Sequence, residues 1–229
     1  MQYILLAGAL FLGTHLAVSS TGLRHRLVGL LGEKGYLAVY SLLAFATLGY
    51  LIWLYGALPR YDYLWTPSPA LYNAAKVLMP FSLIIAIGGF MVKNPTGVGM
   101  EKLLQSADDD ADIARGVTRI TRHPFQWGVV LWAFAHLLAN GDTNSVVFFS
   151  TFALLSGFGT LLMDRRKAAS LGASWQAYAA STSNLPFVAI FQRRNRLVVG
   201  ELWLPVGVGV AAAALIAWGH EWVSGVRIF

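Results

Sequence analysis

The stretch FQWGVVLWAFAHLLAN, residues 125–140, decides how the chain is arranged. It is apolar enough to be a membrane-spanning helix, but it is shorter than the roughly 20 residues that a bilayer crossing requires. Longer apolar runs cover residues 2–19, 36–57, 72–92, 145–163 and 198–219. Whether the chain crosses the membrane five or six times therefore depends on this stretch.

The distribution of Lys and Arg settles that number. If residues 125–140 span the bilayer, the segments 20–35, 93–124 and 164–197 lie on one side and hold all but three of the 17 Lys and Arg residues. Such an excess marks cytoplasmic segments. The sequence therefore predicts an all-α polytopic bundle of about six transmembrane helices, a single domain over residues 1–229. We expect a bacterial inner membrane and periplasmic termini.

Composition excludes several kinds of chemistry. The chain is 56% hydrophobic and 12% charged, about half the usual charged share. It has no cysteine, which excludes disulfides, iron–sulfur clusters and haem attached through Cys-x-x-Cys-His. The net charge of +6 is explained by the cytoplasmic segments. We therefore expect a lipid bilayer as partner and no nucleic acid.

Two of the cytoplasmic segments carry helical patterns. One pattern is apolar, at spacings i, i+4 and i+7: Leu171, Trp175 and Tyr178. The other is basic, at similar spacing: Arg115, Arg119 and Arg122. Both patterns predict helices that lie on the membrane surface.

A tight turn is predicted between the fourth and fifth runs. Gly141 suits the position just after a helix end, and Thr143 or Asn144 can cap the helix that follows. The two runs should therefore form an antiparallel hairpin.

Two of the five histidines lie deep in apolar runs, His15 in the first and His136 in the fourth. Polar groups at such depth tend to be functional. A neutral imidazole there can be an axial ligand of haem iron. Gly128 and Trp132 share the helical face of His136, and the small Gly128 would leave room beside the imidazole. The alternative is a histidine that hydrogen-bonds a carbonyl or hydroxyl group of a neighbouring helix.

The depths of these two histidines differ. His15 is about 12 residues from the outer end of its helix and His136 is about 4, a mismatch of roughly 12 Å at 1.5 Å per residue. Tilt of the helices, or a first helix that starts further out, would reduce it. A site that uses both imidazoles has to accommodate this offset.

Arg122, His123 and Pro124 open the fourth run. Pro124 suits the first helical position, where its missing N–H has no consequence. Arg122 and His123, together with the amides of the helix start, could bind an anion or a cofactor. The alternative is a capped helix end that carries cytoplasmic charge. His123 and His136 are roughly 20 Å apart along one helix, so they cannot share a metal.

A clustered set of residues carries a family resemblance. It comprises Thr121-Arg122-His123-Pro124, Gly128, Leu131-Trp132-Ala133, His136-Leu137, Asn140-Gly141-Asp142, Asp164-Arg165-Arg166-Lys167, Gly172 and Trp175, with Gly13-Thr14-His15 near the N-terminus. In these residues the chain resembles the NnrU family of membrane proteins. That family is named for its association with nitrite and nitric oxide reduction, which implies a role in that metabolism.

A weaker resemblance links the chain to a relative of that family, 15-cis-zeta-carotene isomerase. It implies a membrane isomerase that uses non-covalent haem b for a redox-dependent cis-to-trans isomerisation. It also implies that His15 and His136 are the haem ligands. The substrate would be a lipid-soluble polyene, and the carotene itself does not follow from the weaker resemblance. The redox partner is not specified.

Two alternatives remain open. Arg122-His123-Pro124 followed by Gly128 also resembles isoprenylcysteine and phospholipid methyltransferases, which use S-adenosylmethionine. Those enzymes usually carry an acidic pair after the next helix, where this chain has Asp164-Arg165, so the departure weighs against them. Asp164 is expected to form a local ion pair with the cytoplasmic cations beside it. The other alternative is a non-enzymatic assembly or signalling protein.

Overall fold

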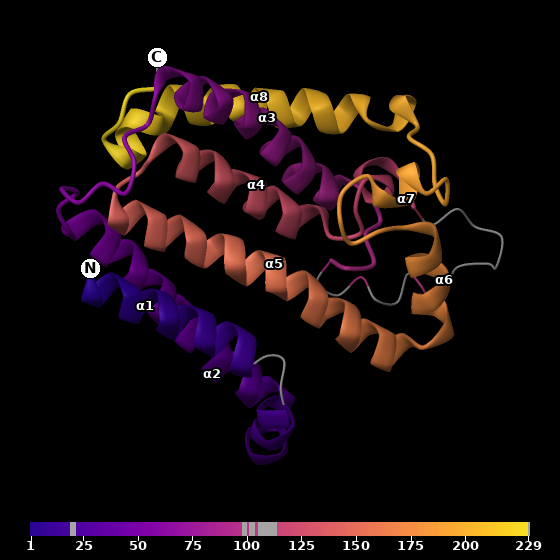
Figure 1. Cartoon of the computed structure of the whole chain (residues 1–229). Coiled ribbons are helices and arrows are strands. Elements are labelled where there is room, and N and C mark those ends of the chain that lie inside the picture. Colours follow the sequence, from indigo (N-terminus) through magenta and orange to yellow (C-terminus); the bar gives the residue numbers. More distant parts are fainter. Residues whose placement is uncertain (19–21, 98–99, 101–103, 105–113, 229) are drawn as a thin grey trace. The chain divides into compact units, whose positions relative to one another are not determined.

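The structure, a computed structural model, describes residues 1–18, 22–97, 100, 104 and 114–228 (Figure 1). Within these residues the regular structure is helical, apart from one antiparallel bridge between Tyr63 and Asp142. The all-α prediction is therefore confirmed. Four helices are long and apolar enough to cross a bilayer, which agrees with a membrane protein. The side that each terminus faces stays a prediction.

The helices follow the predicted runs. In chain order they are α1 (Gln2–Gly13), α2 (Gly22–Ala57), α3 (Pro69–Met91), α4 (Pro124–Ala139), α5 (Thr143–Leu171), α6 (Ala173–Ser181), α7 (Val188–Phe191) and α8 (Trp203–Ser224). The four long apolar helices are α2, α3, α5 and α8, whereas α1 and α4 are shorter. A π-helical turn, Thr14–Val18, extends α1. The predicted end of the first run at Ser19 lies outside the described residues.

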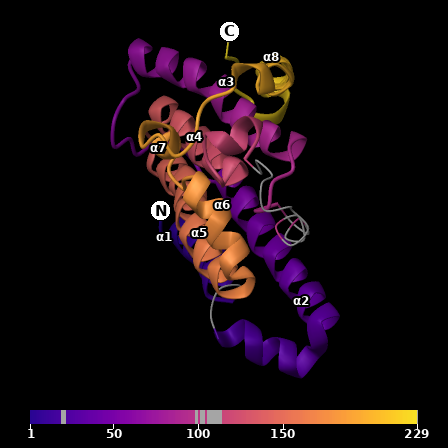
Figure 2. The same cartoon turned by 90° about the vertical axis from the view of Figure 1, so that its right-hand side faces the viewer.

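The long helix α2 begins at Gly22 rather than at residue 36. Gly32 breaks it with φ 70° and ψ 165°, a conformation that glycine adopts without steric penalty. Across this break the Arg24 guanidinium pairs with the Glu33 carboxylate at 2.6 Å, and Figure 2 shows the bend. Hydropathy missed the part before the break because its charged side chains interrupt the apolar run.

The predicted turn between α4 and α5 exists, but its residues act differently from the prediction. Asp142 Oδ1 accepts the Ser145 amide at 2.9 Å, so Asp142 caps α5, rather than Thr143 or Asn144. Gly141 does not have a positive φ. A Cβ on Gly141 would lie 1.7 Å from the Trp65 carbonyl oxygen. A glycine is required at position 141 because the Trp65 backbone approaches it closely, and not because the helix ends there in a left-handed conformation.

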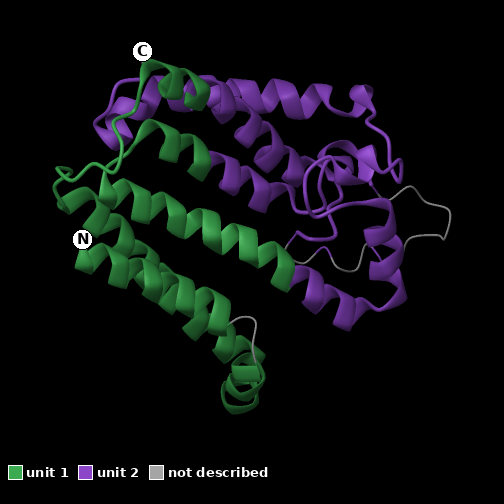
Figure 3. Cartoon of the chain, viewed as in Figure 1, with its two compact units in different colours: residues 1–75, 133–162 green, residues 76–132, 163–229 purple. Residues whose placement is uncertain are grey.

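Contacts divide the chain into two compact units (Figure 3). Unit 1 contains residues 1–75 and 133–162, and unit 2 contains residues 76–132 and 163–229. The boundaries fall within α3, α4 and α5. His15 and His136 therefore belong to unit 1, whereas Arg122, His123 and Asp164 belong to unit 2.

Small residues let helices of unit 2 approach closely. A Cβ on Gly128 of α4 would lie 2.5 Å from the Ala86 Cβ of α3, and one on Gly209 of α8 would lie 2.6 Å from Ile84. Such small-residue contacts are typical of helix packing in membranes. The space expected beside His136 at Gly128 is therefore filled by Ala86, and the glycine has a packing role.

Both predicted surface helices differ from expectation. The apolar one exists as α6, but Trp175 and Tyr178 are buried and pack with Leu104 inside unit 2. The basic segment forms only a short 3₁₀ turn, Gly116–Arg119. Arg119 is buried there and pairs with Glu201 at 2.8 Å. The prediction that these faces lie against the membrane is therefore wrong, because protein groups satisfy them instead.

Candidate functional site

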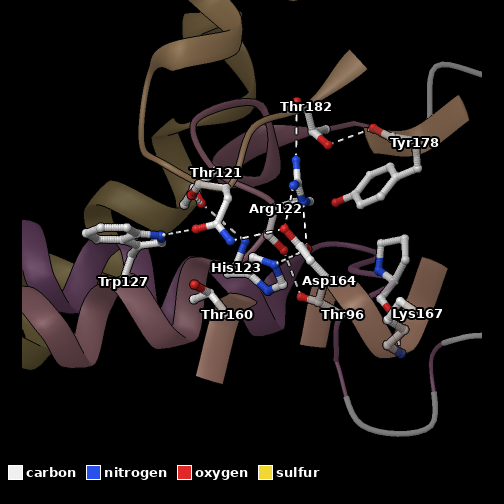
Figure 4. Close-up of polar contacts among 12 residues, drawn as sticks. Thr96, Thr121, Arg122, His123, Trp127, Thr160, Asp164, Lys167, Tyr178 and Thr182 are labelled. Carbon is white, nitrogen blue, oxygen red and sulfur yellow. Dashed lines mark hydrogen bonds and ion pairs between the residues drawn. The ribbon is translucent and has the colours of Figure 1, made fainter. Parts of the chain in front are cut away.

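The start of α4 fixes His123 through its backbone. Pro124 is the first helical residue, as predicted. The His123 amide donates to Thr121 Oγ1 at 3.2 Å, and the His123 carbonyl accepts the Trp127 amide at 3.0 Å. With both backbone groups held, the imidazole has a defined direction, and it points toward α5 (Figure 4).

Asp164 of α5 collects the polar side chains of this region. Its Oδ1 accepts Arg122 Nε at 2.9 Å and His123 Nε2 at 2.6 Å. Its Oδ2 accepts Arg122 Nη2 and, at 3.1 Å, Asn184 Nδ2. We call these four residues the Asp164 centre. The paired fork of Arg122 with the carboxylate is the geometry in which such bonds are strongest.

The protonation of His123 follows from its surroundings. The side chain is fully buried, and this burial lowers the pKa of His123 below its ordinary value, although Asp164 acts in the opposite direction. A neutral imidazole that donates Nε2–H to Asp164 leaves the lone pair on Nδ1. That atom is buried and has no hydrogen-bond partner among the described residues. Arg122 and Asp164 then cancel each other's charge.

The segment after α6 closes this centre. Thr121 Oγ1 donates to the Asn184 carbonyl at 2.5 Å, and the Arg122 amide donates to the Ser183 carbonyl at 2.9 Å. Trp127 Nε1 donates to Asn184 Oδ1 at 3.3 Å. Three hydrogen bonds therefore lock the α4 start to residues 183 and 184, which are distant in the sequence.

A groove opens beside this segment. Its volume is about 570 Å³, and it is lined by Arg122, Ala179, Ala180, Thr182, Ser183, Asn184, Leu185, Val188, Gln192 and Arg194. Arg122 thus reaches from the Asp164 carboxylate to the wall of an accessible hollow. Burial raises the pKa of the nearby Tyr178, so its phenol stays neutral and is no base at ordinary pH.

His15 lies in the π-helical turn after α1. Its Nδ1 lies 2.8 Å from the Phe11 carbonyl oxygen, so Nδ1 carries the proton and Nε2 carries the lone pair. The ring packs on Phe11 at 4.2 Å and on Tyr40 at 5.9 Å between centroids. π-helical turns occur frequently at functional sites. Histidines that bind metals usually donate their other N–H in this way.

His136 lies near the end of α4 in the same unit. Its imidazole stacks on Phe149 of α5 with centroids 4.4 Å apart, and its carbonyl accepts Asn140 Nδ2 at 2.9 Å. Trp132, placed on the same helical face by the sequence, is half-buried and belongs to unit 2.

A row of aromatic rings in unit 1 links the two histidines. Phe11 packs on Phe152 at 5.6 Å, Phe152 on Phe148 at 5.1 Å and Phe148 on Phe149 at 5.2 Å. We call these four side chains the aromatic row. His15 adjoins one end and His136 the other, so both imidazoles face the same apolar part of unit 1.

Sequence reasoning missed the partners of Asp164 and the pair of Arg119 with Glu201. Asp164 was expected to pair with neighbouring cations such as Arg165, but its partners come from the α4 start and from residue 184. Its place as the one acidic residue of α5 was the available signal. Within the described ranges, no three His, Asp or Glu side chains gather in a way that could hold a metal ion.

Comparisons with known proteins give a consistent relationship. The chain is 39% identical over 84 residues to a chloroplastic 15-cis-zeta-carotene isomerase of Zea mays, and 38% identical over 84 residues to that of Arabidopsis thaliana. Each match covers 36% of this chain and 22% of the relative, so the chain spans about a fifth of the length of these enzymes. No solved structure matches.

A family model described as NnrU protein matches residues 3–228, nearly the whole chain. The match includes His15, His136, the Asp164 centre and the four helices that are long and apolar enough to span a membrane. The chain therefore belongs to the NnrU family.

Proposed function

We propose that this protein is a membrane isomerase that converts a cis double bond of a lipid-soluble polyene to trans, with haem b held non-covalently by His15 and His136. The similarity to the 15-cis-zeta-carotene isomerases over 84 residues carries this proposal. Because the match covers only part of those enzymes, the substrate is proposed as a class and not as that carotene.

The tautomer of His15 supports the role of haem ligand. Only a nitrogen that bears a lone pair can bind iron, and the bond from Nδ1 to the Phe11 carbonyl leaves that lone pair on Nε2. A hydrogen bond to a backbone carbonyl was the alternative explanation of this residue. The carbonyl found here belongs to α1, which His15 extends, and not to the neighbouring helix that this alternative named.

The directions of the helices reduce the depth mismatch. In unit 1, α1 runs parallel to α5, because Gly8 faces Thr151 and Phe11 faces Phe152. The α5 residues that these helices contact give a common scale. His136 is level with Phe149, and His15 lies one helical turn beyond Phe152, so the two differ in depth by roughly 10 Å. Side chains lean toward the N-terminus of their own helix. Since α4 runs opposite to α1, the two imidazoles lean toward each other.

The surroundings suit a double-bond isomerisation. Rotation about a double bond breaks and restores its π bond and needs neither water nor a proton from an acid. The aromatic row keeps water away from the two imidazoles, because Phe11, Phe148 and Phe149 are buried. When bound, haem iron supplies a redox-switchable electron-pair acceptor for the double bond. The residues of unit 1 would orient the imidazoles and the chain of the polyene.

The Asp164 centre has a different part in this proposal. Its charges cancel and its imidazole donates to a carboxylate, so it holds the start of α4 in place. His123 is thus a structural residue in this proposal and not a haem ligand.

The activity is tested with the protein in nanodiscs loaded with a cis-polyene. Dithionite-reduced and ferricyanide-oxidised samples are compared by chromatography of the extracted isomers. We expect trans product in the reduced sample and at least a tenfold lower yield in the oxidised one, on the order of 1.4 kcal/mol in barrier. Equal conversion by haem-free protein would overturn the proposal. Methyl transfer from S-adenosylmethionine without any haem would support the methyltransferase alternative.

A further inference from the structure

A small basic hollow lies in unit 2, apart from the Asp164 centre. Its volume is about 340 Å³, and it is lined by Arg119, Ser181, Arg193, Arg194, Asn195 and Arg196. We call it the arginine hollow. Its lining has four guanidinium groups, one hydroxyl and one amide, and no carboxylate. Such a lining favours an anion.

Two of its arginines build the frame. Arg119 donates to both carboxylate oxygens of Glu201, at 2.8 and 3.0 Å, and to Asn195 Oδ1 at 3.1 Å. Arg194 donates to carbonyl groups at the end of α6, including Thr182 at 2.6 Å. Cations in this position satisfy carbonyls that a helix end leaves without partners. These two side chains are therefore held in place.

Asn195 carries the most specific signal. Its Oδ1 accepts Arg119 Nη1 at 3.1 Å and the Arg196 amide at 2.7 Å. Both neighbours are donors, so the oxygen must face them and the Nδ2 group must face elsewhere. Nδ2 is buried and has no acceptor among the described residues. A buried donor without an acceptor is unfavourable, and Asn195 is one of the residues that line the hollow.

The turn after α7 presents the other two arginines. Arg193 has φ 57°, a left-handed conformation that is uncommon for a residue with a side chain. Its amide donates to Ile190, and the Arg194 amide donates to Ala189, each at 2.9 Å. Arg193 and Arg196 are both exposed, so their guanidinium groups are available at the rim of the hollow.

The chemistry of these donors fits a phosphate group. Guanidinium, amide and hydroxyl donors that surround a point suit an anion with several oxygens. Apolar side chains close to these arginines in the sequence indicate where the phosphate comes from: Phe191 is 81% exposed, Val199 58% and Trp203 73%. Apolar groups beside basic ones are typical of protein surfaces that dip into an anionic bilayer.

We propose that the arginine hollow binds the phosphate of an anionic phospholipid headgroup. The apolar side chains Phe191, Val199 and Trp203 enter the acyl region, and the exposed Arg193 and Arg196 hold the phosphate oxygens.

Native mass spectrometry of the full chain in detergent tests this, with phosphatidylglycerol or phosphatidylcholine added. The double variant Arg193→Gln/Arg196→Gln is compared with Arg165→Gln/Arg166→Gln, which removes the same charge from two exposed arginines elsewhere in unit 2. We expect the first to retain about tenfold less phosphatidylglycerol and the second to match the natural protein. Equal losses in both would show general charge attraction and overturn the site.

Asn195→Asp sharpens the test. The carboxylate keeps both hydrogen bonds that Oδ1 accepts and replaces the buried donor with a negative acceptor, so the fold should persist while phosphatidylglycerol is lost. Because Asn195 lines the hollow, unchanged binding by a folded variant would overturn the site. Full displacement of the lipid by inorganic phosphate would assign the hollow to a soluble anion instead. Equal retention of both lipids would also contradict the proposal.

Discussion

The Asp164 centre in unit 2 and the aromatic row in unit 1 both adjoin histidines, but they give those histidines different partners. His123 donates its Nε2–H to a carboxylate that an arginine already neutralises. His15 donates Nδ1–H to a carbonyl of its own helix and packs on the rings of Phe11 and Tyr40. The first imidazole belongs to a charged network, whereas the second lies among aromatic rings.

Burial alone therefore does not identify a ligand. By burial, His123 would rank first, since its side chain is fully enclosed and His15 is half-buried. The neighbours reverse that order, because His123 is bound to a charged pair and His15 packs on aromatic rings. We infer that the Asp164 centre stabilises the fold and that the aromatic row serves the function, and each inference predicts a different response to substitution.

The largest effect is expected at the Asp164 centre. Asp164→Ala leaves the Arg122 guanidinium, whose side chain is 13% exposed, without its counter-ion. Removing one partner of such a pair lowers the free energy of unfolding by about 3–5 kcal/mol. Thermal unfolding in detergent, followed by tryptophan fluorescence, measures this. The exposed neighbour gives the control, because Arg165→Ala should change stability by less than about 0.5 kcal/mol.

A double-mutant cycle then isolates the pair. Arg122→Ala/Asp164→Ala should be destabilised by clearly less than the sum of the two single variants, since it leaves no uncompensated charge. Additive effects would mean that the two groups act independently. The inference that the Asp164 centre stabilises the fold as a unit would then be wrong.

Packing at Gly128 gives the next largest effect. A methyl group there would lie 2.5 Å from the Ala86 Cβ, and overpacking of this kind lowers the free energy of unfolding by about 1–3 kcal/mol. Gly157→Ala in α5 is the matched control, because no atom lies within 4 Å of its added Cβ. We expect Gly128→Ala to melt earlier even in haem-free protein. A loss confined to haem-loaded protein would instead give Gly128 a cofactor role.

The pH dependence of stability distinguishes the state of His123. Burial lowers the pKa of His123 in the folded protein, so the unfolded chain binds more protons below the ordinary pKa of about 6.5. Stability should therefore fall as the pH drops from about 7 to about 5. In His123→Gln, which keeps a donor for Asp164, this fall should be smaller. A steeper fall in the variant would indicate a protonated imidazole.

The smallest effect is expected at Glu201. Its hydrogen bonds with Arg119, and next with the Gly116 amide, lower the pKa of Glu201 below its ordinary 4.5, against a smaller opposing effect of burial. The resulting stabilisation is present above pH 4.5 and is lost as the pH falls through the lower folded value. Melting curves of Glu201→Gln should thus lie below those of the natural protein at pH 6 and approach them near pH 3. A difference in melting temperature that stays the same from pH 6 to pH 3 would show that the titration of Glu201 does not contribute to stability.

Much of the fold could be predicted from the sequence because hydropathy and positive charge are summed over many residues. The six apolar runs and the hairpin of α4 and α5 depend on such sums. The surface helices could not be predicted, since apolar or basic periodicity does not say whether lipid or protein covers a face. Trp175 and Arg119 both turn inward, toward partners distant in the sequence.

The pairing of side chains was harder to predict from the sequence than the helices were. Asp164 is followed in the sequence by three cations, and nothing in that pattern indicates that its partners are Arg122, His123 and Asn184. The histidines of unit 1 could be singled out because an imidazole in an apolar run is rare. The tautomer of His15 depends on a helical backbone carbonyl, which the sequence does not specify.

The most direct test of the contrast is the visible spectrum of four histidine variants purified after expression with ample haem precursor. Alanine replaces His15, His136, His123 or the exposed His25 in turn. The account predicts a Soret band that shifts on dithionite reduction in the natural protein, in His25→Ala and in folded His123→Ala, and its loss in His15→Ala and His136→Ala. Loss of the band in His123→Ala alone would contradict the account.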